Sequence, residues 1–189
     1  MKTLDSNANC EYLRYISDTA DPKEVLRELM IQYGNDVWNY AYSMTRKWEV
    51  ADDISQEVFI KVYKNLFTFR NEASVKTWLL KITRNTVLDY KKSAFFRRVT
   101  LVDYISAKGT ESSAEAEVIE KMAVNDIWKQ VLKLPPKYRE VLILYGHYQL
   151  SMREIADLLG VSEGTVKSRL HHARAKVIKL KESEIHGSA

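Results

Sequence analysis

Residues 150–177 read LSMREIADLLGVSEGTVKSRLHHARAKV, and this stretch predicts a helix, a tight turn and a second helix. Ser151 precedes the first apolar run and Glu154 follows it by three residues, which is the pattern of a capping box. Gly160 is suited to end the first helix, because glycine readily takes the left-handed conformation found at helix C-caps. Ser162 then caps the second helix, in which cationic side chains are frequent.

The apolar residues of this stretch fit a helix-turn-helix unit. In such a unit the first helix braces the second, and the second lies in the major groove of DNA. Ile155, Ala156 and Leu159 would face the core, and Val161 and Val166 would pack beneath the second helix. The alternative is a solvated basic helix, which leaves the caps, the glycine turn and the valines unexplained. We therefore predict a DNA-reading unit.

The exposed face of the second helix offers side chains for both the backbone and the bases of a duplex. Lys and Arg neutralise phosphates, Ser, Thr, Lys and His reach base edges, and a capped helix N-terminus attracts a phosphate. The two adjacent histidines are not expected to bind a metal, because neighbouring helical residues point about 100° apart. The candidate DNA-binding residues on this helix are Ser162, Glu163, Thr165, Lys167, Ser168, His171, His172 and Arg174.

The composition indicates an all-α fold. Of the 189 residues, 46% are hydrophobic and 29% are charged, as in a globular protein. Six Gly and three Pro leave little material for hairpins. The basic charge is concentrated late in the chain, where residues 127–182 hold eleven Lys or Arg against five Asp or Glu. Residues 1–92 hold fourteen against thirteen, so the DNA-like charge belongs to the C-terminal part.

A single cysteine, Cys10, excludes an internal disulfide framework and fits a reducing cytosol. The chain shows no cationic start followed by an apolar leader, and no apolar run of membrane-spanning length. We expect a soluble, intracellular protein without a cofactor or a metal.

The N-terminal part predicts a helical domain at 21–92, after a polar arm at 1–20. Asp21 and Pro22 mark the start of its first helix, and Gly34 is expected to break or kink the pattern. A second helix is expected after Gly34, and a third and a fourth are expected within 49–69 and 75–92. The apolar stripes of the four segments are Val25, Leu26, Leu29, Met30 and Tyr33, then Val37, Trp38, Tyr40, Ala41 and Met44, then Ile54, Val58, Val62 and Leu66, then Trp78, Leu79, Ile82, Thr86 and Tyr90.

Residues 93–117 are predicted to be a partly ordered tether, since their Gly- and Ser-containing stretch has linker composition. A second domain follows at 118–182, with a tail at 183–189. Its first helix should end at Pro135–Pro136, because proline interrupts a helix. Another helix is expected at 137–148, and the last helix should reach about Lys181.

The stretch ADDISQE, at residues 51–57, gathers acidic and amide side chains early in a predicted helix. Asp53, Gln56 and Glu57 share one face, and Asp52 lies beside them. Carboxylates in a first helical turn also simply favour the helix dipole. A partner surface and a dipole effect therefore both remain open from the charges alone.

The stretch FTFRNEASVKTWLLKITRN, at residues 67–85, combines aromatic, amide and cationic groups around a loop. An unpaired strand needs such groups for stacking, for hydrogen bonds to a base and for backbone neutralisation. The alternative for Phe69 and Trp78 is a place in the core. The candidate strand-binding residues are Lys61, Phe69, Arg70, Asn71, Lys81, Arg84 and Asn85, with Lys76 also on the helix.

Three segments, in order, resemble the extracytoplasmic-function (ECF, group 4) σ factors of bacterial RNA polymerase, in the σ70 family. Residues 51–69 look like the core-binding helix of that family, and residues 76–92 look like its −10 recognition helix. Residues 134–177 look like its −35 reader. The resemblance covers about residues 22–182, and it implies two small all-α domains joined by a linker: a σ2-like bundle and a σ4-like helix-turn-helix domain.

The resemblance also implies roles for the residues that match. Asp53, Gln56 and Glu57, beside Asp52, would dock on the β′ clamp helices of core polymerase. Phe69, Asn71 and Asn85 would hold a flipped −10 base, with Lys61, Arg70, Lys81 and Arg84 near the strand. Arg139 and Arg174 would meet −35 phosphates, while Lys167, Ser168, His171 and His172 meet the duplex. The apolar face at 142–148 would meet the β-flap tip, unless it is plain core.

The implied function is promoter-specific initiation with core RNA polymerase in the cytoplasm, under an anti-σ factor that is often membrane-anchored in this family. The main alternative is a self-sufficient helix-turn-helix repressor or activator, which would bind duplex DNA tightly without polymerase. An enzyme with a small-molecule substrate finds no support, since no phosphate loop, HExxH motif or paired nucleophile and base occurs.

Overall fold

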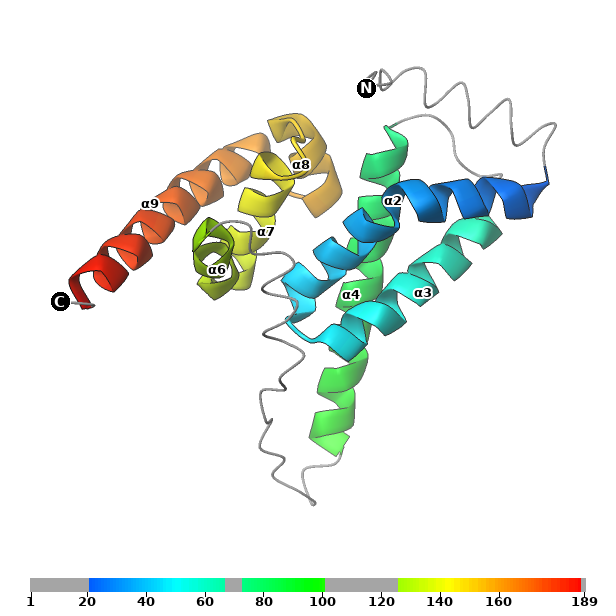
Figure 1. The fold of residues 1–189 in the computed structure, drawn as a ribbon, viewed down its shortest axis with the longest axis horizontal. Helices are drawn as coiled ribbons and strands as arrows, with labels where there is room; N and C mark the ends of the chain where they lie inside the picture. Colours follow the sequence, from blue (N-terminus) through cyan, green and yellow to red (C-terminus); the bar gives the residue numbers. More distant parts are fainter. Residues whose placement is uncertain (1–20, 67–72, 101–125, 188–189) are drawn as a thin grey trace. The chain divides into compact units, whose positions relative to one another are not determined.

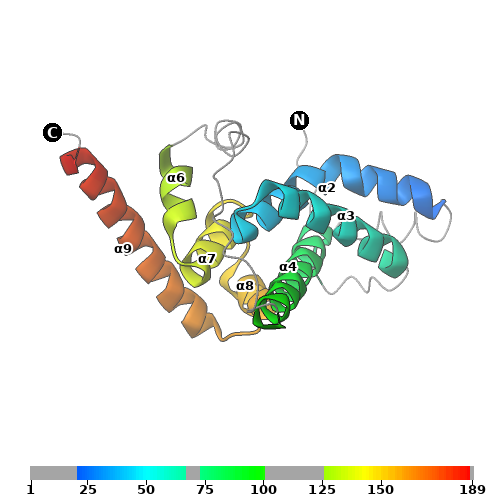
Figure 2. The same cartoon turned by 90° about the horizontal axis from the view of Figure 1, so that it is seen from below.

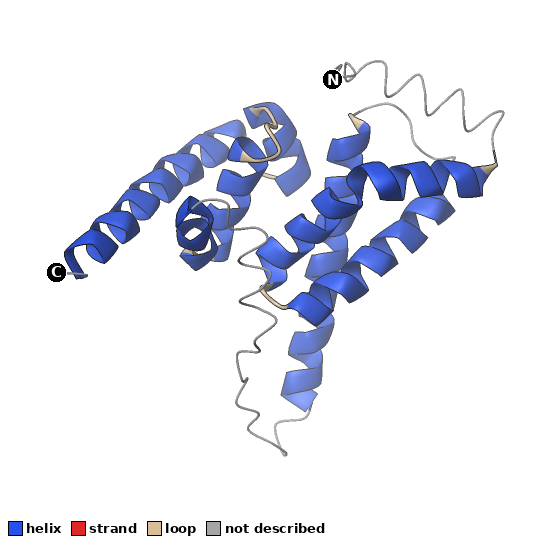
Figure 3. Ribbon diagram, viewed as in Figure 1, coloured by secondary structure: helices blue, strands red, loops and turns tan. Residues whose placement is uncertain are grey.

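The computed structural model describes residues 21–66, 73–100 and 126–187, and within these ranges the long elements are all α-helices and none is a strand (Figure 3). The predicted all-α fold class is confirmed. The chain divides into two compact units, residues 1–108 and 109–189, and each is described by itself. None of the helices in the described ranges combines the length and the apolar character needed to cross a membrane.

The first unit contains three helices, α2 (Pro22–Thr45), α3 (Trp48–Asn65) and α4 (Val75–Thr100) (Figure 1). Each of the three packs against the other two (Figure 2). Burial of their apolar stripes holds the bundle together, and the stripe predicted on α3 is confirmed, since Ile54, Val58, Val62 and Leu66 are all buried. On α2 the most deeply buried residues are Val37, Tyr40 and Ala41.

Helix α2 begins as its sequence predicts and then runs further than expected. The Asp21 side chain accepts a hydrogen bond of 3.0 Å from the Lys23 amide, and Pro22 occupies the first turn. The two segments expected on either side of Gly34 form one helix that continues to Thr45, and its axis changes direction about midway, in keeping with a kink rather than a break (Figure 1). Glycine costs a helix only about 0.5–1 kcal/mol, which the buried neighbours Tyr33 and Val37 outweigh.

Helix α4 buries only part of its predicted stripe: Leu79 and Thr86 are buried as expected, and Thr83 joins them. Trp78, Ile82 and Tyr90 are only half-buried, whereas Thr83 and Thr86 are almost fully buried. Their hydroxyls donate to the carbonyls four residues earlier, at 2.8 and 3.0 Å, so no polar group is left unsatisfied in the core. The helix also ends at Thr100, so the expected end at Lys92 is wrong. The remaining buried residues of α4 include Val75, Leu79, Leu80 and Val87.

Met30 is the other error in the predicted core of this unit, because its side chain is 49% exposed on α2. Residues 25, 29 and 33 define the buried stripe. Residue 30 directly follows residue 29, so its side chain points about 100° away from that residue around the helix. The predicted arm at 1–20, the loop residues Phe69, Arg70 and Asn71, and residues 101–117 of the predicted tether lie outside the described residues.

The second unit contains α6 (Asp126–Lys133), α7 (Pro136–Gly146), α8 (Met152–Leu159) and α9 (Glu163–Gly187). Helix α9 packs against each of the other three. The predicted stop at Pro135–Pro136 is confirmed, and Pro136 opens α7. The last helix ends at Gly187, so the expected end near Lys181 is wrong. Residues 118–125 of the expected first helix lie outside the described residues.

Candidate nucleic-acid and protein interfaces

The turn between α8 and α9 has the geometry that residues 150–162 predict. The Glu154 amide donates to Ser151 Oγ at 3.2 Å, and the Ser151 amide donates to Glu154 Oε2 at 2.9 Å, which completes the capping box. Gly160 has φ 68° and ψ 40°, the left-handed conformation. The Thr165 amide donates to Ser162 Oγ at 3.2 Å and so caps α9. These caps fix the angle at which α9 leaves the turn.

The brace beneath α9 is also as predicted. Ile155 and Val166 are fully buried, Ala156 and Leu159 are each 6% exposed, and Val161 is half-buried. Burial of this side of α9 leaves the opposite side to solvent, with polar residues at its start. Lys167, Ser168, His171 and His172 are all exposed, as are Ser162 and Glu163, and Thr165 is half-buried.

The two exposed histidines have different surroundings. Ser168 and His171, three residues apart, lie on one side of α9. His172 instead points towards α7, where its ring centroid is 6.0 Å from that of Tyr138. Lys176 also lies over the Tyr138 ring, with Nζ 5.8 Å from the ring centroid. His171 is therefore better placed than His172 to follow Ser168 into a groove.

The structure corrects the role of −35 phosphate contact that the sequence suggested for Arg139. Its side chain is 6% exposed, and Nη1 donates a hydrogen bond of 2.9 Å to the Leu132 carbonyl. Leu132 is in the last turn of α6, where carbonyl groups lack helical partners. A buried guanidinium that satisfies such a carbonyl is part of the core, so Arg139 is not available to a −35 phosphate.

Arg174 is exposed on α9 and also contacts α7. Its guanidinium is 5.3 Å from the Tyr145 ring centroid, a cation–π contact between α9 and α7. Six residues separate Ser168 from Arg174, which puts them about a third of a turn apart around the helix. Arg174 nevertheless lies one turn beyond His171 and two turns beyond Lys167, so it shares their side of α9, and its contact with a −35 phosphate stays a prediction.

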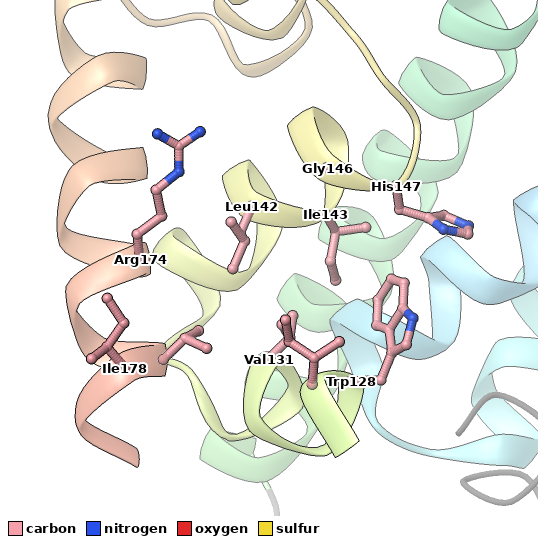
Figure 4. A pocket seen from close by; sticks show the side chains of 10 residues that line it. Trp128, Val131, Leu142, Ile143, Gly146, His147, Arg174 and Ile178 are labelled. Carbon is pink, nitrogen blue, oxygen red and sulfur yellow. The ribbon is translucent and has the colours of Figure 1, made fainter. Parts of the chain in front are cut away.

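Arg174 also borders an apolar groove of about 530 Å³ in the second unit (Figure 4). Helix α6 contributes Trp128 and Val131, α7 contributes Leu142 and Ile143, and α9 contributes Ile178. Ile178 and Ile127, which also line the groove, are each 57% exposed. Part of the apolar face expected at 142–148 is thus open surface, whereas Ile143, Leu144 and Tyr148 are buried.

The acidic stretch on α3 separates into one internal and three external residues. Asp52 is half-buried and accepts a hydrogen bond of 2.6 Å from Trp38 Nε1. The Trp38 ring stacks on Tyr42, with centroids 5.2 Å apart, and meets the edge of Trp48 at 4.5 Å. Asp52 therefore ties α3 to α2.

The exposed members of the acidic stretch are Asp53, Gln56 and Glu57. Ile60 and Tyr63, which are 54% and 40% exposed, continue the same side of the helix. Sequence reasoning missed these two apolar residues. The helical spacing from Asp53 and Gln56 could have identified them.

The candidate strand-binding residues fall in several places. Lys81 and Asn85 are exposed and one turn apart on α4. Arg84 is half-buried, and Lys76 pairs with Asp36 of α2 at 3.6 Å. Lys61 lies between helices: Nζ is 2.7 Å from Glu57 Oε1 and donates to Thr86 Oγ1 at 3.1 Å. Among the described residues no three His, Cys, Asp or Glu side chains converge as a metal site.

Two family models match the chain, one in each unit. The model of "Sigma-70 region 2" matches residues 29–95, and the model of "Sigma-70, region 4" matches residues 125–177. The first match covers most of α2, α3 and α4. The second covers α6 to α8 and the first part of α9.

Curated relatives match most of the chain. The ECF RNA polymerase sigma factor SigW of Bacillus subtilis (strain 168) is 31% identical over 163 residues, which covers 80% of this chain and 86% of the relative. The ECF RNA polymerase sigma factor SigL of Mycobacterium tuberculosis (strain ATCC 35801 / TMC 107 / Erdman) is 32% identical over 164 residues, which covers 84% and 90%.

Solved structures have a similar fold. The sigma factor RpoE in complex with the anti-sigma factor NepR, from Bartonella quintana, has a TM-score of 0.63 and 24% identity, with 85% of this chain and 98% of that chain covered. CnrH in complex with the cytosolic domain of CnrY has a TM-score of 0.66 and 21% identity, with 95% and 99% covered.

Proposed function

The chain belongs to the ECF σ factors of bacterial RNA polymerase, and from this membership we propose that it binds core enzyme through α3, reads the −10 strand through α4 and reads the −35 duplex through α9. The observation that carries the proposal is the presence, in order, of a region 2 match on one helical unit and a region 4 match on the other. A self-sufficient regulator is not favoured, because it would need only the second.

The outer face of α3 is the proposed docking surface for the β′ clamp helices. Carboxylate and amide groups at Asp53, Gln56 and Glu57 adjoin the exposed side chains of Ile60 and Tyr63. An apolar patch bordered by charge is typical of a protein interface. Asp52 supports this face through Trp38 and is not proposed to meet the polymerase.

The proposed DNA contacts follow the exposed sides of α4 and α9. Lys81 and Asn85 offer a cation and an amide to an unpaired strand. Lys167, Ser168 and His171 offer a phosphate contact and base-edge contacts to a duplex. Glu163 and Thr165 flank the capped start of α9, and Ser162 holds that start in place.

The apolar groove between α6, α7 and α9 is the proposed seat of the β-flap tip. Its lining is mostly apolar and includes the exposed side chains of Ile127 and Ile178, and helix-in-groove docking is a recurring mode of recognition. Ile178→Ser should therefore weaken assembly with core polymerase, while Lys181→Ser, an exposed change outside the groove lining, should not.

We further propose that the protein acts in the cytoplasm with the polymerase and has no catalytic activity of its own. We also propose that an anti-σ factor controls it, and in many systems of this family that factor is membrane-anchored. Family membership supports the proposals on catalysis and on the cytoplasm. Control by an anti-σ factor is prompted by the structural neighbour RpoE, which was solved in complex with the anti-sigma factor NepR.

The decisive experiment is gel filtration of the purified chain with σ-free core polymerase, followed by transcription from a pool of promoter fragments. Co-elution near one to one and initiation at defined start sites support the proposal. Absence of association, together with tight duplex binding by the chain alone, would replace it with the self-sufficient regulator.

A further inference from the structure

Lys61 links the two helices of the first unit to which we assign polymerase and −10 contacts. Its Nζ is 2.7 Å from Glu57 Oε1 on α3, and it donates to Thr86 Oγ1 on α4 at 3.1 Å. Thr86 is 1% exposed, and its own hydroxyl donates to the Ile82 carbonyl at 3.0 Å. A continuous chain of polar contacts therefore runs from a carboxylate on the face of α3 to the backbone of α4.

The contact with Thr86 distinguishes this arrangement from an ordinary surface pair. A Glu–Lys pair four residues apart on one helix stabilises only that helix, and weakly. Lys61 additionally reaches a buried hydroxyl 25 residues away on another helix. The Thr86 hydroxyl gives its only proton to the Ile82 carbonyl, so a lone pair of its oxygen accepts from the Lys61 ammonium group. Hydrogen bonds that adjoin a core are stronger than those in water.

The position of Thr86 makes this link relevant to DNA. Asn85 precedes Thr86, and Lys81 lies one turn before Asn85 on the same continuous helix. Any rotation or sliding of α4 against α3 would move both side chains together. A tether at Thr86 resists such motion at the position next to the proposed base contact.

We propose that Lys61 is a positioning residue that holds α4 in one orientation against the docking helix α3, so that Asn85 and Lys81 meet the −10 strand correctly once polymerase holds α3. The inference rests on the proposed function, because that function assigns the two faces. It also replaces the role that the sequence suggested for Lys61, which was direct contact with the strand.

The test uses holoenzyme reconstituted from core polymerase and full-length variants, on a promoter fragment that the wild-type holoenzyme transcribes. The variants are Lys61→Met, Thr86→Val and the double variant. Thr86→Ser keeps the hydroxyl, and Lys64→Met is the matched control, since Lys64 is an exposed lysine one turn along α3. The readouts are core affinity, the rate of strand opening at −10, the salt dependence of promoter binding, and the thermal unfolding midpoint of each free variant.

We expect Lys61→Met and Thr86→Val each to slow strand opening about five- to tenfold, with core affinity within about twofold of wild type. The double variant should open no more slowly than the slower single variant, because coupled residues are non-additive. Thr86→Ser and Lys64→Met should behave as wild type. The salt slope should not change in any of them.

Three results would overturn the inference. A salt slope lower by about one in Lys61→Met, with wild-type opening in Thr86→Val, would make Lys61 a strand contact. Multiplicative effects in the double variant would remove the link between the residues. A lower unfolding midpoint with unchanged opening would leave only a structural role. Failure of the wild-type chain to form an initiating holoenzyme would instead remove the proposed function itself, and this inference with it.

Discussion

Arg139 on α7 donates a hydrogen bond of 2.9 Å to the carbonyl of Leu132, in the last turn of α6. The contact spans the Pro135–Pro136 interruption and gives a partner to a carbonyl that the helix itself leaves free. The cationic group also lies at the negative end of the α6 dipole. One buried side chain thus fixes how α6 meets α7, the two helices that supply most of the apolar groove.

Replacement of Arg139 by Met should destabilise the second unit by about 2–3 kcal/mol, because a charge-assisted buried hydrogen bond is lost and a carbonyl is left unpaired. Chemical denaturation measures the change. Lys137→Met, at an exposed position on the same helix, should stay within about 0.5 kcal/mol of wild type. A folded Arg139→Met variant with a reduced salt slope for −35 DNA would restore the phosphate role.

Replacement of Gly160 by Ala should cost about 1 kcal/mol, because its φ of 68° is unfavourable for a residue with a Cβ. No atom lies within 4 Å of the added Cβ, so the backbone conformation alone sets the cost. Gly160→Asn should cost less, since Asn tolerates the left-handed region. Equal stability of wild type and Gly160→Ala in thermal unfolding would contradict this account.

Gly164 provides the opposite case on the same unit. It lies in the first turn of α9, where a Cβ would have only an ordinary contact of 3.8 Å with Ser162 Oγ. Gly164→Ala should therefore raise the unfolding free energy by about 0.5–1 kcal/mol, because it lowers the entropy of the unfolded chain. The same thermal unfolding series measures it. A loss of stability would show that the start of α9 is under strain.

Replacement of both Asp53 by Lys and Ile60 by Ser should lower core-polymerase affinity at least tenfold while the unfolding free energy changes little. Both side chains are exposed, and neither contributes to the Lys61 link. Ile31→Ser is the matched control, because Ile31 is 76% exposed and lies on α2, not on the proposed docking helix. Competition for fluorescently labelled core enzyme gives the affinities, and wild-type affinity in the double variant would remove α3 as the docking surface.

Replacement of Lys167 by Met should weaken −35 binding by holoenzyme to a similar degree for all sequences and reduce the salt slope by about one, as loss of one phosphate contact predicts. Ser168→Ala should instead alter base preference with little change in slope. Lys179→Met, late on the same helix, is the control. The slopes come from titrations between low and physiological salt, and an unchanged slope in Lys167→Met would place that lysine off the backbone.

Local pattern was sufficient to predict several elements of this protein. The Ser151–Glu154 capping box, the turn at Gly160 and the buried stripe of α3 depend on residues within a few positions of one another, so the sequence contains their physical causes. The two-helix reader and its brace follow from the same short-range rules. The all-α class follows from the scarcity of Gly and Pro together with helical periodicity.

Other features depended on groups that are distant in the sequence. Arg139 has a side chain that could bind a phosphate, but its hydrogen bond to the Leu132 carbonyl of α6 decides its role. Lys61 and Asp52 look like surface charges until Thr86 and Trp38, on neighbouring helices, supply their partners. Helical periodicity determined which residues share a face of each helix in this protein. Only the packing of one helix on another decided which polar side chains are engaged inside and which remain exposed for DNA and polymerase, because hydrogen-bond partners and burial arise from the tertiary structure.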